Sequence, residues 1–244
     1  NVDFRNTSAD YEFATDLKPV DVVSELARDT FMGYRRENGK VGTRNYIGIL
    51  TSVNCSATAA RMIASAFGPD EMTKYPNVDG VVAFVHGTGC GMAGQGEGFD
   101  ALQRVLWGYA RNPNHAGIMM VGLGCEMNQI DWLLEAYGLK QGPLFKVMNI
   151  QDTEGFAKTV ETGIEMVRAM LPEANKCQRE PCPVSDLMVA LQCGGSDALS
   201  GITANPALGY ACDLLVAQGG TAVLAETPEI YGAEHLLTRR ACDE

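Results

Sequence analysis

Short apolar runs alternate with helical stretches along most of this chain. From Phe31 onward, six runs are apolar almost throughout instead of alternating with polar residues. Continuous apolar runs of about 4–8 residues are typical of parallel strands that are covered on both faces. The runs are YIGILTSV (46–53), VDGVVAFV (78–85), GIMMVGLG (117–124), LFKVMNI (144–150), LMVALQ (187–192) and TAVLAE (221–226).

Helical patterns fill the intervals between these runs. They are ATAARMIASAF, GFDALQRVLWGYARN, MNQIDWLLEAYG, TEGFAKTVETGIEMVRAML and NPALGYACDLLVAQGG. A strand followed by a helix recurs roughly every 25–40 residues, which is the spacing of right-handed βαβ units. We therefore predict an α/β fold with an open, mostly parallel sheet flanked by helices, in a Rossmann-like βαβ succession.

The ends of this pattern suggest the domain organisation. Residues 1–30 are polar and acidic, and we interpret them as a linker or arm from a further N-terminal domain. Residues 31–244 form the predicted α/β domain, and the polar stretch NKCQREPCPVS (175–185) is a candidate boundary between two halves of it. Because the chain does not begin with Met, we expect it to be part of a longer protein.

Composition and charge narrow the classes of partner. The chain has 30 acidic and 19 basic residues, a net charge of −11, which argues against nucleic acid and anionic membranes because both bind basic surfaces. No apolar run reaches the roughly 20 residues of a membrane span, and we expect a cytoplasmic location. A small anionic substrate is still compatible, since it needs only a few local cations or helix N-termini.

Cysteine recurs at one place in the pattern, just after a predicted strand. Cys55, Cys90 and Cys125 lie 35 residues apart, and Cys193 follows the fifth run. Other polar residues share these positions: His86, Glu126, Asn128, Gln151, Asp152, Ser196, Asp197 and Glu226. Since ligands of parallel α/β sheets bind outside the carboxyl ends of the strands, we expect these loops to lie along one edge and to share a cleft.

Thiol, imidazole and carboxylate groups at one edge suit iron or zinc. Three or four thiolates would bind an iron–sulfur cluster, whereas two or three mixed ligands with open positions would hold Fe²⁺ as a Lewis acid. Glycines beside the cysteines allow the backbone to approach a ligand closely.

Other interpretations of the same residues exist. A cysteine at a strand end is most often a small buried apolar residue, and His86 is equally well interpreted as a core histidine. The chain would then be a metal-free α/β binding module. An NAD-dependent oxidoreductase would need a glycine loop directly after the first strand, where this chain has NCSAT, and GQGEG (94–98) has no strand directly before it.

One segment, FMGYRRENGKVGTRNYIGIL (31–50), is unusually basic. Its Arg35, Arg36, Lys40 and Arg44 form either a solvated turn or a carboxylate-binding arm. Arg44 precedes the first predicted strand and so belongs to the opposite edge from the cysteines. Arg61, in the helix after Cys55, is nearer to the expected cleft.

The motifs together resemble the altronate/galactarate dehydratase family of sugar-acid hydro-lyases. They are GYRRENGKVGTRNYIGI, NCSATAAR, HGTGCGM, RNPNHAG, GLGCEMNQI, LQCGGSDALSGITANPALG and ETPEIYGAEHLL, in the family's order from about residue 31 to the end. The resemblance implies a small N-terminal β domain before this region and a further C-terminal region after it, so we expect this chain to be the central α/β part of a longer enzyme. The resemblance implies an iron-dependent enzyme that removes water from an aldaric or aldonic acid to give a keto acid.

The resemblance also implies roles for matching positions. Its metal ligands would come from Cys55, His86, Cys90, Cys125 and Cys193, with Fe²⁺ expected first and an iron–sulfur cluster as the alternative. Proton transfer is expected from Glu126, Asp197 and His86, and substrate binding from Asn128, Ser196, Asn205 and Arg61. The wording of NCSAT and HGTGCGM favours galactarate over altronate, and a sulfo-lyase acting on a sulfonated hydroxy acid is a related option. We expect a homo-oligomer, and activity of this part of the enzyme alone is not expected.

Overall fold

The computed structural model describes residues 15, 20–195 and 197–241. The chain forms two compact units: a larger one, Met32–Cys182, and a smaller one made of Asn1–Phe31 and Pro183–Glu244. All six predicted strands are confirmed, with ends shifted by two residues or fewer, and so is the α/β fold. The strands nevertheless belong to two separate sheets, so the expectation of one shared edge is wrong.

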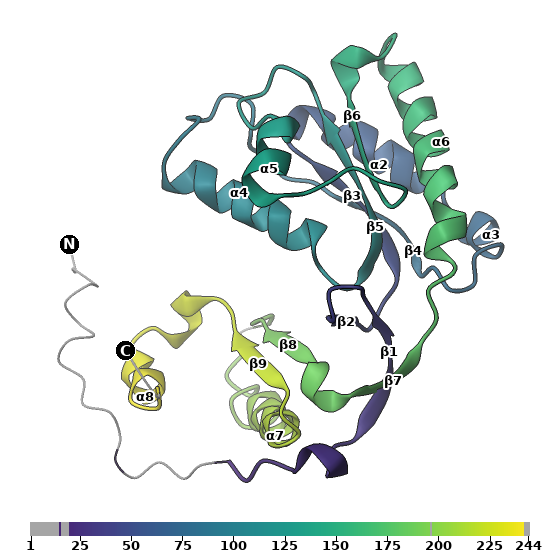
Figure 1. Cartoon of the computed structure of the whole chain (residues 1–244). Coiled ribbons are helices and arrows are strands. Elements are labelled where there is room, and N and C mark those ends of the chain that lie inside the picture. The colour runs from purple at the N-terminus through teal and green to yellow at the C-terminus, as the bar shows by residue number, and fades with distance from the viewer. Residues whose placement is uncertain (1–14, 16–19, 196, 242–244) are drawn as a thin grey trace. The chain divides into compact units, whose positions relative to one another are not determined.

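The larger unit is built on a parallel sheet of four strands in the order β4-β3-β5-β6 (Figure 1). Its strands are β3 (Tyr46–Thr51), β4 (Gly80–Phe84), β5 (His115–Gly122) and β6 (Phe145–Asn149). Its helices are α2 (Ala57–Ser65), α3 (Pro69–Met72), α4 (Glu97–Ala110), α5 (Ile130–Tyr137) and α6 (Phe156–Ala174). The short α3 was not predicted from the sequence.

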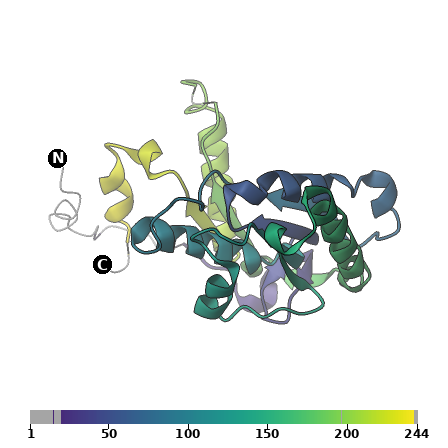
Figure 2. The same cartoon turned by 90° about the horizontal axis from the view of Figure 1, so that it is seen from above.

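Helices cover both faces of this sheet (Figure 1 and Figure 2). On one face, Ile47 and Met119 of the strands pack with Ile63 of α2 and Val167 of α6. On the other face, Leu50 and Met120 pack with Leu106 of α4 and Leu133 of α5. Because helices cover both faces of the sheet, the side chains on both faces are buried, and the strands are apolar at nearly every position.

The strand order creates a switch point between β3 and β5. After β3 the chain crosses to β4 on one side, and after β4 it returns to the other side of β3 to form β5. The helices that follow β3 and β5, α2 and α5, therefore lie on opposite faces. In open α/β sheets, the crevice for a ligand lies outside the carboxyl ends of the strands at such a point.

A second small sheet lies where the chain passes between the two units. It has the order β2-β1-β7, with β1 (Thr30–Arg35), β2 (Val41–Gly42) and β7 (Glu180–Pro183). The predicted sheet is split because β7, which follows α6, pairs with β1 instead of adding a fifth strand beside β6.

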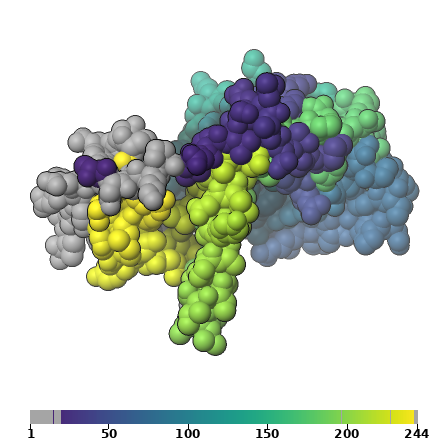
Figure 3. Space-filling model, turned by 90° about the horizontal axis from the view of Figure 1, so that it is seen from below, coloured from purple at the N-terminus to yellow at the C-terminus, as the bar shows by residue number. Residues whose placement is uncertain are grey.

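The smaller unit contains a parallel pair, β8 (Met188–Leu191) and β9 (Thr221–Leu224). Between them lies α7 (Ala204–Ala217), and after them come a 3-10 turn (Thr227–Ile230) and α8 (Glu234–Thr238). No residue of α7 is buried, and Figure 3 shows the helix in yellow-green as an exposed column of side chains. Within the described residues, no helix combines the length and apolar character needed to cross a membrane.

Candidate functional site

Three cysteines lie on neighbouring loops at the carboxyl ends of β3, β4 and β5. Cys55 is in the 3-10 turn Asn54–Ser56 after β3, Cys90 is in the loop after β4, and Cys125 is in the loop after β5. All three side chains are exposed. The prediction that their strand ends share an edge of one sheet is confirmed for these three.

The loop after β4 lies directly against the end of β3. The backbone N–H of Asn54 donates to the carbonyl of Thr88 at 2.8 Å. Gly89 has φ +104°, and a Cβ there would lie 2.7 Å from the carbonyl oxygen of Ser52. Only glycine tolerates both the backbone angle and the close approach, and this contact brings Cys90 beside Cys55.

The Cys55 thiol is influenced electrostatically by the other two cysteines. Desolvation raises the pKa of Cys55, and hydrogen bonding with the Cys90 thiol and the charges of Cys90 and Cys125 raise it further. Like charges disfavour ionisation of a neighbour, which is why cysteines on the two adjacent loops raise the pKa of Cys55.

Glu126 is held inside the loop that carries Cys125. Its side chain is only 2 % exposed, and it accepts hydrogen bonds from the Ser52 hydroxyl at 2.5 Å, the Gly124 N–H at 2.6 Å and the Leu123 N–H at 3.1 Å. Burial alone would raise the pKa of Glu126, but these hydrogen bonds outweigh it and lower the pKa. An ionised, fully bonded carboxylate is well suited to holding the loop.

Asn128 is also buried, with no exposed surface. Its amide donates to the carbonyl of Ser52 at 3.1 Å, and its oxygen accepts from the Gln103 amide at 3.5 Å. Both Asn128 and Glu126 thus make hydrogen bonds to other residues of the chain. The substrate-binding role of Asn128 and the proton-transfer role of Glu126 stay predictions.

His86 is anchored at both ring nitrogens. Nε2 lies 2.9 Å from the carbonyl oxygen of Thr51, and Nδ1 accepts from the Thr88 N–H at 3.3 Å. These bonds orient the imidazole at the end of β4. Its roles as a metal ligand and in proton transfer stay predictions, as does substrate binding by Arg61, which is exposed on α2.

The remaining predicted site residues follow β8 in the smaller unit. Cys193 is exposed, and its N–H donates to the Glu226 carboxylate at 2.6 Å. Asp197 accepts from the N–H groups of Leu199 and Ser200 at 2.9 and 3.0 Å, and the Asn205 N–H donates to the Ser200 carbonyl. The sheet of β8 and β9 is distinct from that of the three cysteines, and Ser196 lies outside the described residues.

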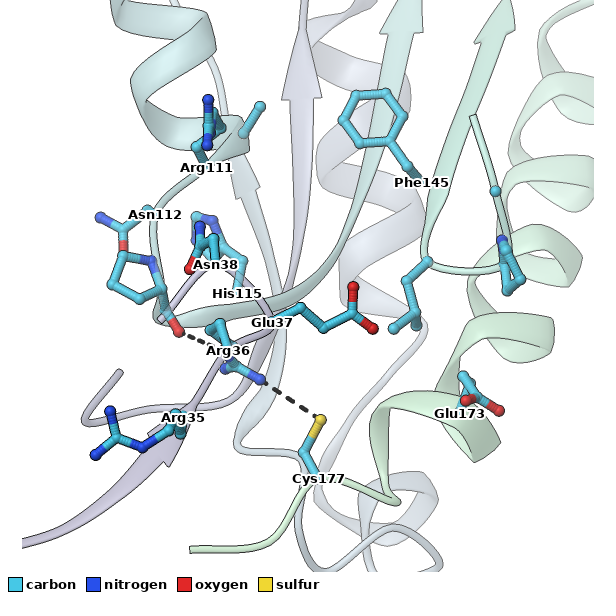
Figure 4. Close-up of a pocket in the computed structure, with 15 residues that line it drawn as sticks. Arg35, Arg36, Glu37, Asn38, Arg111, Asn112, His115, Phe145, Glu173 and Cys177 are labelled. Carbon is cyan, nitrogen blue, oxygen red and sulfur yellow. Dashed lines mark hydrogen bonds between the residues drawn. The ribbon is translucent and has the colours of Figure 1, made fainter. Parts of the chain in front are cut away.

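The basic segment lines a different cavity, of about 600 Å³, at the amino ends of the strands in the larger unit (Figure 4). Arg36 donates there to the carbonyls of Pro113 at 2.7 Å and Arg44 at 3.2 Å, and to the Cys177 sulfur at 3.5 Å. Asn114 accepts from the N–H groups of Thr43 and Arg44. Hydrogen bonds therefore join the motifs GYRRENGKVGTRN and RNPNH, and the Arg36 guanidinium stabilises the fold.

Two residues in the cysteine site were not among the predicted site residues. Ser52 lies within a predicted strand, and Gln151 is a strand-end residue to which the sequence assigns no role. Gln151 donates from its amide to the Cys125 sulfur at 3.3 Å. Both could have been identified from the sequence as polar residues at the end of an apolar run, in TSV for Ser52 and in NIQD for Gln151.

Comparison with known proteins shows which family the chain belongs to. The model for "D-galactarate dehydratase/Altronate hydrolase, second domain" matches residues 33–175, which include all three cysteine loops. The chain belongs to the D-galactarate/altronate dehydratase family. The model for "D-galactarate/Altronate dehydratase, C-terminal" matches residues 184–244. The expected resemblance is thus confirmed.

The chain spans about half the length of the curated relatives that it matches. It is 44% identical over 221 residues to the galactarate dehydratase (L-threo-forming) of Escherichia coli, covering 88% of this chain and 42% of the relative. It is 37% identical over 215 residues to the altronate dehydratase of Bacillus subtilis, with coverage of 88% and 42%. It is 33% identical over 228 residues to the (2R)-sulfolactate sulfo-lyase subunit beta of Chromohalobacter salexigens, with coverage of 90% and 52%.

Proposed function

We propose that this chain is part of a hydro-lyase that removes water from an aldaric or aldonic sugar acid. The observation that carries the proposal is the group of Cys55, Cys90 and Cys125 at the switch point of a dehydratase-family sheet. A galactarate-type substrate is preferred because identity to the galactarate dehydratase, 44%, exceeds identity to the Escherichia coli altronate dehydratase, 38%.

The reaction sets clear chemical demands. A base removes the proton on the carbon next to a carboxylate, the hydroxyl on the following carbon leaves with a proton as water, and the resulting enol becomes a keto acid. Negative charge develops on the carboxylate during the first step and must be stabilised. When bound, iron would supply this stabilisation as a Lewis acid.

The donor set of the site fits iron. Cys55, Cys90 and Cys125 offer soft sulfur ligands on adjacent loops, which suit iron and iron–sulfur clusters. Among the described residues, no three His, Cys, Asp or Glu side chains converge as ligands of a single ion. Mononuclear Fe²⁺ and a cluster, in which each sulfur binds a different iron atom, are both compatible with thiols on adjacent loops.

The residues of the chain would hold this group and keep its loops in place. Gly89 lets the Cys90 loop approach β3, and Glu126 ties the Cys125 loop to Ser52. Neither residue is a metal ligand, but each holds a loop that carries a ligand sulfur. Rigid support of this kind determines how accurately ligands are placed.

The test is the iron and acid-labile sulfide content of the complete protein, purified without oxygen. We expect iron that is lost in Cys55→Ser, Cys90→Ser and Cys125→Ser and retained in Cys212→Ser, a half-buried cysteine of α7. Matching sulfide would indicate a cluster. Iron without sulfide would indicate mononuclear Fe²⁺. Iron that survives all three substitutions would overturn the assignment of the site.

Activity measurements decide the reaction. Keto-acid formation from galactarate, altronate and sulfolactate should be compared, and we expect the highest kcat/KM for galactarate. Release of sulfite from sulfolactate as the main reaction would indicate a sulfo-lyase instead. No metal and no activity on any of the three would favour a binding module with structural cysteines.

A further inference from the structure

The fourth strand of the larger sheet also contributes to the cysteine site. Gln151 lies in the 3-10 turn Ile150–Asp152, directly after β6. Its side-chain amide donates to the Cys125 sulfur at 3.3 Å, and its backbone N–H donates to the carbonyl of Leu123 at 3.0 Å. This turn is therefore attached to the Cys125 loop through both the side chain and the backbone.

The backbone beside Cys125 packs directly on the Gln151 side chain. Gly124 has φ +118°, and a Cβ at this position would lie 2.8 Å from Oε1 and 3.2 Å from Cβ of Gln151. On its other side, the loop is bonded by Gln129, whose amide donates to the carbonyls of Glu126 at 2.6 Å and Gly124 at 3.4 Å. Two glutamines thus bond the Cys125 loop, and of these Gln151 contacts the sulfur itself.

We propose that Gln151 is a positioning residue for Cys125, which orients the sulfur and stabilises negative charge on it through the N–H···S bond. The inference deepens the proposed function and rests on it, since it concerns how one of the three ligand sulfurs is tuned. Hydrogen bonds to ligand sulfur are among the factors that set the reduction potential of iron–sulfur clusters. They also fix the direction from which the sulfur presents its lone pairs.

The test uses the complete protein without metal, so that it does not depend on iron. Alkylation of Cys55, Cys90 and Cys125 by iodoacetamide is followed at pH 7, where an ordinary thiol is mostly protonated, by mass spectrometry of the three peptides. In Gln151→Met, which keeps the length of the side chain and removes the donor, we expect Cys125 to react about fivefold more slowly, as for the loss of one ordinary hydrogen bond. Cys55 and Cys90 should change less than twofold.

Two further variants make the result specific. Gln141→Met applies the same substitution to an exposed glutamine between α5 and β6 and should leave all three rates unchanged. Gln151→Glu places a negative charge beside the sulfur and should slow Cys125 more than Gln151→Met does. It also provides the test if Gln151→Met unfolds, which would be seen as faster alkylation of all three cysteines together.

Cys125 rates within twofold of the original in a folded Gln151 variant would overturn the proposal. Failure of the proposed function is distinguishable, because it would appear as absence of iron in the complete protein while the alkylation pattern of the metal-free protein is unaffected. A cluster-containing protein gives a second measurement, since Gln151→Met should shift its reduction potential to a more negative value.

Discussion

The Ser52 hydroxyl donates a 2.5 Å hydrogen bond to the buried carboxylate of Glu126. Ser52 lies just after β3, three residues before Cys55, and Glu126 directly follows Cys125. One bond therefore joins the two loops on either side of the switch point. Because both residues are buried, water does not compete for the bond. Together with the bond from the Asn128 amide to the Ser52 carbonyl, it fixes the relative position of the two loops.

Glu126→Gln should destabilise the protein at neutral pH. The amide keeps one oxygen and replaces the other with an N–H group, so the N–H of either Gly124 or Leu123 loses its acceptor. One buried donor left unsatisfied costs about 2 kcal/mol. Urea denaturation at pH 7 measures the change. Glu135→Gln, an exposed position on α5, should change stability by less than about 0.5 kcal/mol, and equal effects of the two would contradict the role of Glu126.

The same pair predicts a pH dependence. Hydrogen bonding lowers the pKa of Glu126 in the folded protein, so the unfolded chain binds the proton more readily and the stabilisation is present above the unfolded value of about 4.3. It is lost as the pH falls from there through the lower folded pKa. The stability difference between the original protein and Glu126→Gln should shrink below about pH 4.3; a constant difference from neutral to acidic pH would refute it.

Arg36→Lys should weaken the fold without changing substrate affinity. An ammonium group cannot reach the Pro113 and Arg44 carbonyls and the Cys177 sulfur together, as the guanidinium does, and we expect a loss of about 1–3 kcal/mol. Arg104→Lys on α4 is exposed and serves as the control. A raised KM for the sugar acid with unchanged stability would instead support the carboxylate-binding arm.

Gly163 on α6 is required by its contact with α2. A Cβ there would lie 2.3 Å from Cδ1 of Ile63, so Gly163→Ala should cost about 1–3 kcal/mol by overpacking. Ile63→Val removes that methyl group, and the double variant should recover part of the loss. Gly108→Ala in α4, with no atom near the added Cβ, should be neutral or stabilising by up to about 1 kcal/mol; additive effects at Gly163 and Ile63 would exclude the contact.

The sequence alone was enough to predict the six strands, the helices between them, the α/β class and the family. Continuous apolar runs identify strands that are buried on both faces, and this property depends on local composition. The cysteines at strand ends could likewise be predicted, because in a parallel sheet every strand end points to the same edge.

Only the tertiary structure decided how these parts are grouped. The order β4-β3-β5-β6 and the separate pair β8-β9 depend on which way each crossover turns and on the pairing of β7 with β1, and these long-range choices leave no periodic signal. The same holds for individual side chains. Glu126 and Asn128 have the chemistry of site residues, yet their hydrogen-bond partners Ser52 and Gln103 are distant in sequence. The sequence therefore could not show that both side chains are buried and bonded to the protein.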